Sequence, residues 1–185
     1  MAEWIDLVPH PTTPCPAVSR LEGRVTRLAG GALRIDYELF GFLEQVALPP
    51  VSKPLRRDDL WRHSCFEFFV RGEDATYAEF NFSPSTEWAA YRFDDYRSGM
   101  APLGLADDPQ VTRVQSDEDS YVQAAIVTLP DGDRTRMSLA AVIELKDGTK
   151  SYWALAHPPG KPDFHDPAGF TLELPPAPST SSPRT

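Results

Sequence analysis

The chain has little positive charge, few cysteines and no long apolar run. Lysine and arginine together number 18, against 27 aspartate and glutamate residues, so the formal net charge is −9. This excess of negative charge disfavours a nucleic acid or an anionic membrane as a partner, because both are themselves negative. Apolar runs also fall short of the roughly 20 residues that a membrane-spanning helix needs.

A secretory signal and a cysteine framework are also missing. Residues 1–11 lack the basic and apolar regions of a signal peptide, so we expect a cytoplasmic protein. Cys15 falls in a proline-rich stretch and Cys65 in an expected strand, and their positions do not indicate a disulfide. The sequence does not indicate an oligomeric state.

Helical periodicity is absent, and short runs of alternating apolar and polar residues take its place. Residues 19–28 and 32–41 flank two glycines and predict a β-hairpin; residues 110–129 and 138–157 predict two more. At 185 residues and 41% hydrophobic content the chain can bury a sizeable core. We therefore predict an all-β fold, an antiparallel two-sheet β-sandwich of jelly-roll type.

The expected boundaries follow from the prolines. Residues 1–175 are predicted to form one domain, in which the proline-rich stretch 4–18 is an extended arm lying on the sandwich. The polar, Pro/Ser-rich residues 176–185 are predicted to be a disordered tail. Residues 42–60 form a long connection, and connections of that length are often functional.

Aromatic residues concentrate in residues 61–100, which hold 11 of the 20 in the chain. The alternation there predicts three strands joined by tight turns. It places Glu67, Glu79 and Asn81 near one another on one face, with Trp88 or Arg92 beside them. A face that combines acidic, amide and aromatic groups indicates a binding surface, because buried carboxylates need a partner or a ligand.

Three motifs give the chain a family resemblance. They are the spacing Trp61-x5-Glu67, the strand EFNFSP at 79–84 and the closing segment HDPAGFTLEL at 165–174. In these the chain resembles the DOMON-like superfamily and, within it, family 9 carbohydrate-binding modules. The resemblance implies a jelly-roll-like sandwich that binds a sugar or, in other branches, a haem.

The resemblance also implies roles for particular residues. In the sugar-binding branch an aromatic clamp holds the pyranose, and a glutamate, an arginine and an amide bond its hydroxyls. Trp61 and Glu67 match the first aromatic and the glutamate, and only Phe164 stands near the place of the second clamp tryptophan. The full set of predicted ligand-binding residues is Trp61, Arg62, His63, Glu67, Glu79, Asn81, Arg92 and Phe164.

Enzymatic alternatives rest on single pairs of residues. Glu67 and Glu79 could act as the paired carboxylates of a glycoside hydrolase, which stand about 5–10 Å apart. Cys65 and His63 are two residues apart on one strand face, as a nucleophile and its base would be. An orienting third group is not visible, so a structural cysteine is favoured.

Cofactor alternatives are similarly open. A haem-binding domain with a redox role would draw its axial ligands from Met100, Met137 and the histidines. His157, Asp163, His165 and Asp166 share one loop, but their spacing matches no closed metal site. The leading prediction is a non-enzymatic protein without cofactor that binds a small, carbohydrate-like ligand; a purely structural interaction module is the remaining alternative.

Overall fold

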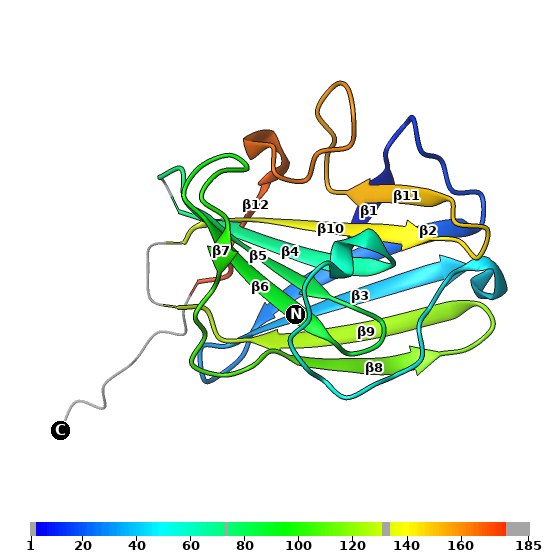
Figure 1. The fold of residues 1–185 in the computed structure, drawn as a ribbon, viewed down its shortest axis with the longest axis horizontal. Coiled ribbons are helices and arrows are strands. Elements are labelled where there is room, and N and C mark those ends of the chain that lie inside the picture. The colour runs from blue at the N-terminus through cyan, green and yellow to red at the C-terminus, as the bar shows by residue number, and fades with distance from the viewer. Residues whose placement is uncertain (1–2, 73, 131–133, 177–185) are drawn as a thin grey trace.

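The computed structural model describes residues 3–72, 74–130 and 134–176, and these are almost entirely β-structure (Figure 1). They form twelve strands and three 3-10 helices of three residues each. No helix in these ranges is long and apolar enough to cross a membrane. The strands are β1 (Ile5–Pro9), β2 (Val18–Arg27), β3 (Leu33–Gly41), β4 (Cys65–Arg71), β5 (Tyr77–Phe82), β6 (Trp88–Phe93), β7 (Ala101–Pro102), β8 (Gln110–Ser116), β9 (Ser120–Val127), β10 (Arg136–Glu144), β11 (Lys150–Ala154) and β12 (Leu172–Glu173), and the helices are η1 (Leu43–Gln45), η2 (Leu60–Arg62) and η3 (Pro167–Gly169).

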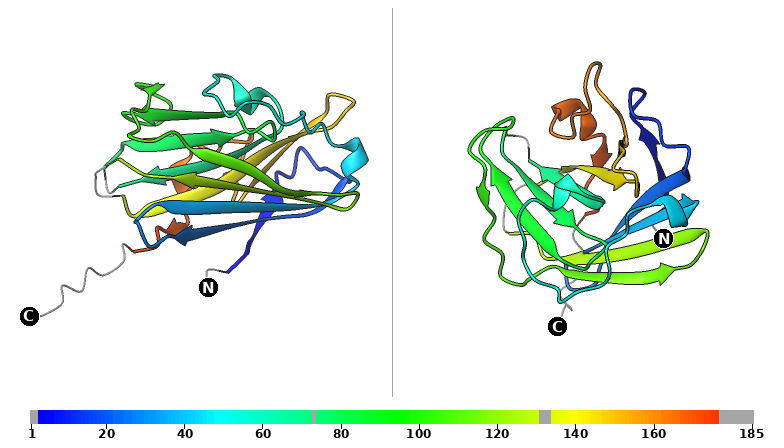
Figure 2. Two further views of the ribbon diagram at one scale, coloured as in Figure 1. Left: turned by 90° about the horizontal axis from the view of Figure 1, so that it is seen from below. Right: turned by 45° about the vertical axis from the view of Figure 1, so that its right-hand side comes forward.

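The strands follow one continuous antiparallel path. Its order is β7-β6-β5-β4-β10-β11-β1-β2-β3-β9-β8, and β12 pairs with β10 at the side. The sheet curls strongly, as a half-barrel does (Figure 2, right). The all-β prediction and the three hairpins β2–β3, β8–β9 and β10–β11 are confirmed. The predicted division into two separate sheets is not confirmed, because the strand pairing continues unbroken through β1.

The first strand corrects the prediction of an arm. Residues 5–7 pair with β2, whereas Val8 and Pro9 pair with β11, so this strand joins the two parts of the path. The argument from prolines was wrong for this segment because Pro9 is the last residue of the strand, and the next three prolines follow it. A proline at the end of a strand costs little, since few ladder bonds remain to be made there.

One face of β4 and β5 packs into the main core, as the alternation predicts. Phe66, Phe68 and Phe80 are fully buried on this inner face. The ring of Phe66 stacks on that of Tyr121 from β9 at 5.8 Å and lies 5.0 Å from that of Tyr37 on β3. These contacts connect the two halves of the path, on either side of β1, and each fully buried ring stabilises the fold by about 1.5–3 kcal/mol.

The other face of the same strands is also buried. Helix η2 and the loop 155–171 cover this outer face, so it forms a second apolar cluster rather than an open surface (Figure 1). Aromatic side chains on both faces of a strand are what such double burial requires. The outer cluster consists of Leu60, Cys65, Phe69, Tyr77, Ala89, Tyr91, Phe93, Ala140, Ala154 and Phe170, with Phe164 packed against it.

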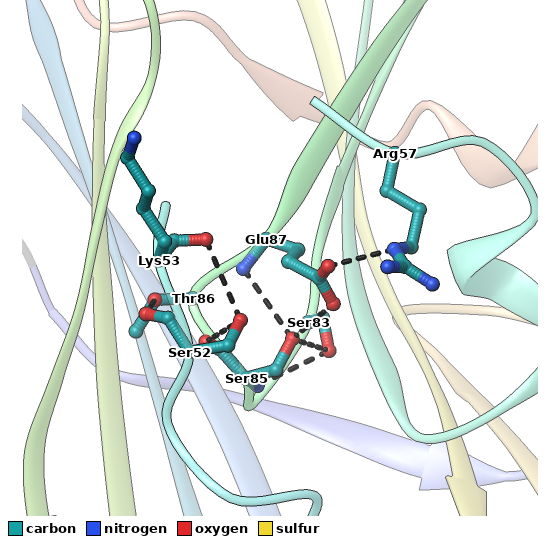
Figure 3. Close-up of polar contacts among 7 residues, drawn as sticks. All are labelled: Ser52, Lys53, Arg57, Ser83, Ser85, Thr86 and Glu87. Carbon is teal, nitrogen blue, oxygen red and sulfur yellow. Dashed lines mark hydrogen bonds and ion pairs between the residues drawn. The ribbon is translucent and has the colours of Figure 1, made fainter. Parts of the chain in front are cut away.

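A strap formed by residues 49–58 is tied to the turn between β5 and β6 (Figure 3). The backbone N–H of Ser52 donates to the Ser85 carbonyl at 2.8 Å, and the Thr86 hydroxyl donates to the Ser52 carbonyl at 3.0 Å. Farther along, the Arg57 guanidinium pairs with Glu87 at 2.7 Å. These bonds fix the strap immediately before η2, and so determine where η2 lies on the outer face.

Candidate functional site

Two carboxyl groups and one amide lie together on the outer face, as predicted. Glu67 on β4 is the cross-strand partner of Asn81 on β5. The Asn81 Nδ2 atom donates to Glu79 Oε1 at 2.6 Å, and the Cys65 thiol donates weakly to Asn81 Oδ1 at 3.5 Å. Glu67 is 3% exposed, Glu79 5% and Asn81 0%, so the cluster is shielded from bulk water.

Glu67 is the least satisfied member of this cluster. Its Oε1 atom is buried and has no hydrogen-bond partner among the described residues. Burial, and then repulsion from Glu79, raise the pKa of the Glu67 carboxyl well above its ordinary value, while Arg97 opposes the shift. A buried polar atom without a partner is uncommon in proteins, because it is costly, and such an atom often marks the place of a ligand or a water.

Glu79 accepts a hydrogen bond from Asn81, but its pKa is still raised. Burial raises its pKa to about 7, against the lowering effects of the Asn81 hydrogen bond and of Arg97. The two carboxyl groups therefore hold protons at pH values at which an exposed glutamate would be ionised. Pairs of this kind gather at functional sites more often than elsewhere.

The cation near the pair is Arg97, not Arg92. Arg92 is the cross-strand partner of Ala78, which faces the inner core, so it projects from the opposite face to Glu79. It is exposed and pairs with Asp94 at 2.7 Å. The predicted neighbourhood of Arg92 and the carboxylates is therefore wrong, because side chains alternate and Tyr91, not Arg92, is the partner of Glu79.

Arg97 connects two loops across the outer face. Its guanidinium pairs with Asp163 at 2.7 Å, and Tyr96 also donates to Asp163. Its backbone has a φ of 51°, which is uncommon outside glycine, and its N–H donates to the Tyr77 hydroxyl at 3.1 Å. The contacts of Tyr96 and Arg97 with Asp163, which we call the latch, hold the β6–β7 loop against the loop 155–171.

His165 lies beneath the latch in an aromatic setting. Its Nδ1 atom is 2.8 Å from the Tyr77 hydroxyl, and its ring meets those of Phe69 and Phe93 edge-on at 5.4 and 5.1 Å. Burial, and then Arg97, lower the pKa of His165 to about 4, so the imidazole is neutral at pH 7. Its Nε2 atom is 3.8 Å from Glu79 Oε2, outside hydrogen-bond distance.

The predicted rim residues lie at the edge of this face. Trp61 in η2 is 44% exposed, and the Arg62 guanidinium stacks over its ring at 5.1 Å. His63 turns away from the cluster, with Nδ1 2.7 Å from Glu144 Oε2. Phe164 packs against the outer cluster and lies 6.0 Å from the Tyr152 ring. The exposed indole therefore adjoins Leu60, which packs into the outer cluster.

The structure does not bring Cys65 and His63 together. Cys65 is buried and bonded to Asn81, whereas His63 is exposed and bonded to Glu144, so the two do not form a nucleophile–base pair. In the part of the chain that the structure describes, no three His, Cys, Asp or Glu side chains gather as metal ligands would. Met137 lies in the inner core and Met100 is exposed.

Sequence reasoning missed Tyr77, Tyr91, Arg97 and the pairing role of Asp163. The two tyrosines could have been predicted from the alternation. Tyr77 is two residues from Glu79 on β5, and Tyr91 is its cross-strand partner on β6, so both lie on the same face as Glu79. The loop residues carried no such signal, since their approach to β5 depends on how two separate loops fold back. The sequence pattern suggests His165 and Asp163 only as metal ligands.

The fold and this cluster define the protein as an all-β half-barrel with a covered acidic and aromatic face. No family model matches the chain, and no curated protein does. Among solved structures, it is similar to a "putative carbohydrate-binding protein" from Bacteroides uniformis, with a TM-score of 0.61. That likeness covers 91% of this chain and 84% of the other at 15% identity, so it shows the fold and leaves the DOMON-like resemblance a prediction.

Proposed function

We propose that the protein binds a carbohydrate on the outer face of β4–β6, without catalysing a reaction on it. The observation that carries the proposal is the buried, unpartnered Glu67 Oε1 on the face into which η2, the helix that bears the exposed Trp61, packs its Leu60. A carboxylate that accepts hydroxyl hydrogens and an indole that stacks on ring C–H groups are complementary to a pyranose. The structural neighbour described as carbohydrate-binding supports the same class of ligand.

The superfamily to which the fold belongs is part of this proposal. We take the curled sheet to be a DOMON-like sandwich, in which the inner faces of β3 and β9 oppose those of β4 and β10. The contacts of Phe66 with Tyr37 and Tyr121 support this, because they cross from one half of the strand path to the other. Family 9 carbohydrate-binding modules remain the branch whose Trp-x5-Glu spacing the chain shares.

The binding face is closed in the structure, so a ligand must displace its cover. Leu60 of η2, Phe164 and Phe170 pack into the apolar cluster of this face, and the latch holds the β6–β7 loop against the loop 155–171. Opening them reduces the observed affinity, because part of the binding energy is used to reach the open form. One stacking platform and two hydrogen bonds to the carboxyl groups, less this cost, suggest a Kd of about 10 μM to 1 mM.

Replacing Trp61 by alanine should weaken saccharide binding about tenfold with little change in melting temperature. The indole is half exposed, so its removal eliminates stacking on the sugar without opening the core. Calorimetric titration with glucose, xylose and cellobiose, together with melting curves, would measure both effects. Phe42→Ala is the control, because Phe42 is 60% exposed but lies at the start of η1, outside the outer cluster. Absence of binding by the unaltered protein at millimolar saccharide would contradict the proposal.

A further inference from the structure

The outer face offers more hydrogen-bond acceptors than donors. Glu67 Oε1 is buried without a partner among the described residues, and Glu79 Oε2 lies 3.8 Å from the Nε2 atom of His165, beyond hydrogen-bond distance. The Asn81 amide could supply a donor, but its Nδ2 atom is already bonded to Glu79 Oε1 at 2.6 Å. When the two carboxyl groups are ionised, this cluster therefore lacks a donor for Glu67 Oε1.

The surrounding donors are engaged elsewhere. The Arg97 guanidinium is bonded to Asp163 at 2.7 Å, and this ion pair offsets part of its charge. The Tyr91 hydroxyl donates to Asp58 Oδ1 at 2.6 Å. These two donors are therefore bonded to aspartates and not to the glutamates, although the charge of Arg97 still lowers the pKa of both glutamates.

Aromatic rings flank the carboxyl groups on the same face. Phe69 and Tyr91 are the cross-strand partners of Glu79, and Tyr77 stacks on Phe93 with the ring centroids 4.6 Å apart. Ring faces attract cations, and the attraction grows when water is excluded. Carboxylates among aromatic rings are well suited to hold an ammonium group, which has three donors and no acceptor.

We infer that the ligand of this face carries an ammonium group, so that the saccharide of the proposed function is an amino sugar. The ammonium group donates to Glu67 Oε1 and to Glu79, and the sugar ring extends towards Trp61. The inference rests on the proposed function for the sugar, but the ammonium site itself follows from the unpartnered acceptor, the second carboxyl group beside it and the aromatic flanks.

The titration of the cluster agrees with this assignment. Without a ligand, protons occupy the place of the cation, because burial raises the pKa of both glutamates. A bound ammonium ion would release those protons, so its binding should strengthen as the pH rises from about 6 to about 8. The titratable and charged groups that face the pair are Cys65 on β4, Tyr77 on β5, Tyr91 on β6 with Asp58 behind it, Arg97 in the β6–β7 loop, and Asp163 and His165 in the loop 155–171.

The first experiment compares three sugars that differ at one substituent. Glucosamine, glucose and N-acetylglucosamine are titrated calorimetrically into the unaltered protein at about pH 6.5 and at matched ionic strength. We expect glucosamine to bind about tenfold more tightly than glucose or N-acetylglucosamine, as one charge-assisted hydrogen bond would give. Equal binding of glucosamine and glucose would overturn the inference and leave carbohydrate binding in place.

Two variants locate the effect. Glu67→Gln and, separately, Glu79→Gln keep the side-chain shape but remove the negative charge, so each should reduce the preference for glucosamine to less than about threefold. Glu118→Gln, an exposed change in the β8–β9 turn, is the matched control and should keep it. A preference unchanged in both buried variants would overturn the inference, because the ammonium group would then be held elsewhere.

The second experiment separates the ammonium site from the sugar. Methylammonium chloride, with sodium chloride as its control, is titrated while the side-chain amide signal of Asn81 is followed by NMR. Methylammonium stays charged from about pH 6 to about pH 8, as a lysine side chain does, and we expect it to shift that signal more at the higher pH. A shift without binding of any sugar would uphold the ammonium site and reject the proposed function. No shift and no sugar binding would reject both.

Discussion

Replacing Glu67 by glutamine should stabilise the protein at about pH 8 and leave its stability nearly unchanged at about pH 4.5. Glu67 is buried beside Glu79, and its pKa is raised well above the ordinary value by burial first and by that neighbour second. In the folded protein the carboxyl group therefore keeps its proton over a pH range in which the unfolded chain has lost it.

The sign of the effect follows from this difference in proton binding. Above about pH 4.5 the folded state holds more protons than the unfolded state, so the free energy of unfolding falls as the pH rises. Each such group contributes a slope of at most about 1.4 kcal/mol per pH unit. A glutamine side chain does not titrate, so the variant does not lose this stability as the pH rises. For Glu79, whose pKa is raised to about 7, the same argument gives Glu79→Gln a gain of about 3 kcal/mol between pH 4.5 and pH 8.

Urea unfolding of the protein and the two variants, at several pH values, would test this. The comparison must be made between proteins at equal pH, because His165 contributes with the opposite sign. Its pKa is lowered to about 4, so its neutral form adds stability as the pH rises towards about 6.5. Glu118→Gln again serves as the exposed control. A stability difference that is the same at low and high pH would mean that Glu67 is ionised in the folded protein.

Replacing Gly41 by alanine should lower the free energy of unfolding by about 3 kcal/mol or more, and the melting temperature by about 10 °C. A Cβ atom at this position would lie 2.1 Å from the Ala17 carbonyl oxygen and 2.9 Å from the Val18 Cα atom. Both are backbone atoms, so a change of side-chain rotamer cannot relieve the contact. The φ of 149° adds strain for any residue with a side chain.

Gly30→Ala is the matched control for this change. Gly30 lies in the β2–β3 turn, and no atom lies within 4 Å of where its Cβ would be, so we expect a shift of less than about 0.5 kcal/mol. Thermal and urea unfolding of both variants would give the difference. If Gly41→Ala melted together with Gly30→Ala, then β3 could not end against β2 at Val18 as the structure has it.

Local alternation predicted the strands and part of the site, and tertiary contacts decided the rest. Glu67, Glu79 and Asn81 came together as expected because period two and adjacent strands are properties of the sequence itself. The loop residues Arg97 and Asp163 lie 66 positions apart, and nothing local links them. Burial of the outer face had one visible sign, the aromatic residues placed on both faces of β4–β6, which an open binding surface would not require.

Pairing of β1 with β11 also has a consequence for synthesis of the protein. The N–H of His10, directly after β1, donates to the Tyr152 carbonyl at 2.7 Å, and Val8 pairs with Ala154. These partners are about 145 residues apart, so the first strand to leave the ribosome must wait for nearly the last one before its second edge is covered. Until then the second edge of β1 is unpaired, which is when a nascent chain can pair wrongly with another copy. We therefore expect chaperone dependence and aggregation during slow translation to be governed by the arrival of residues 150–154.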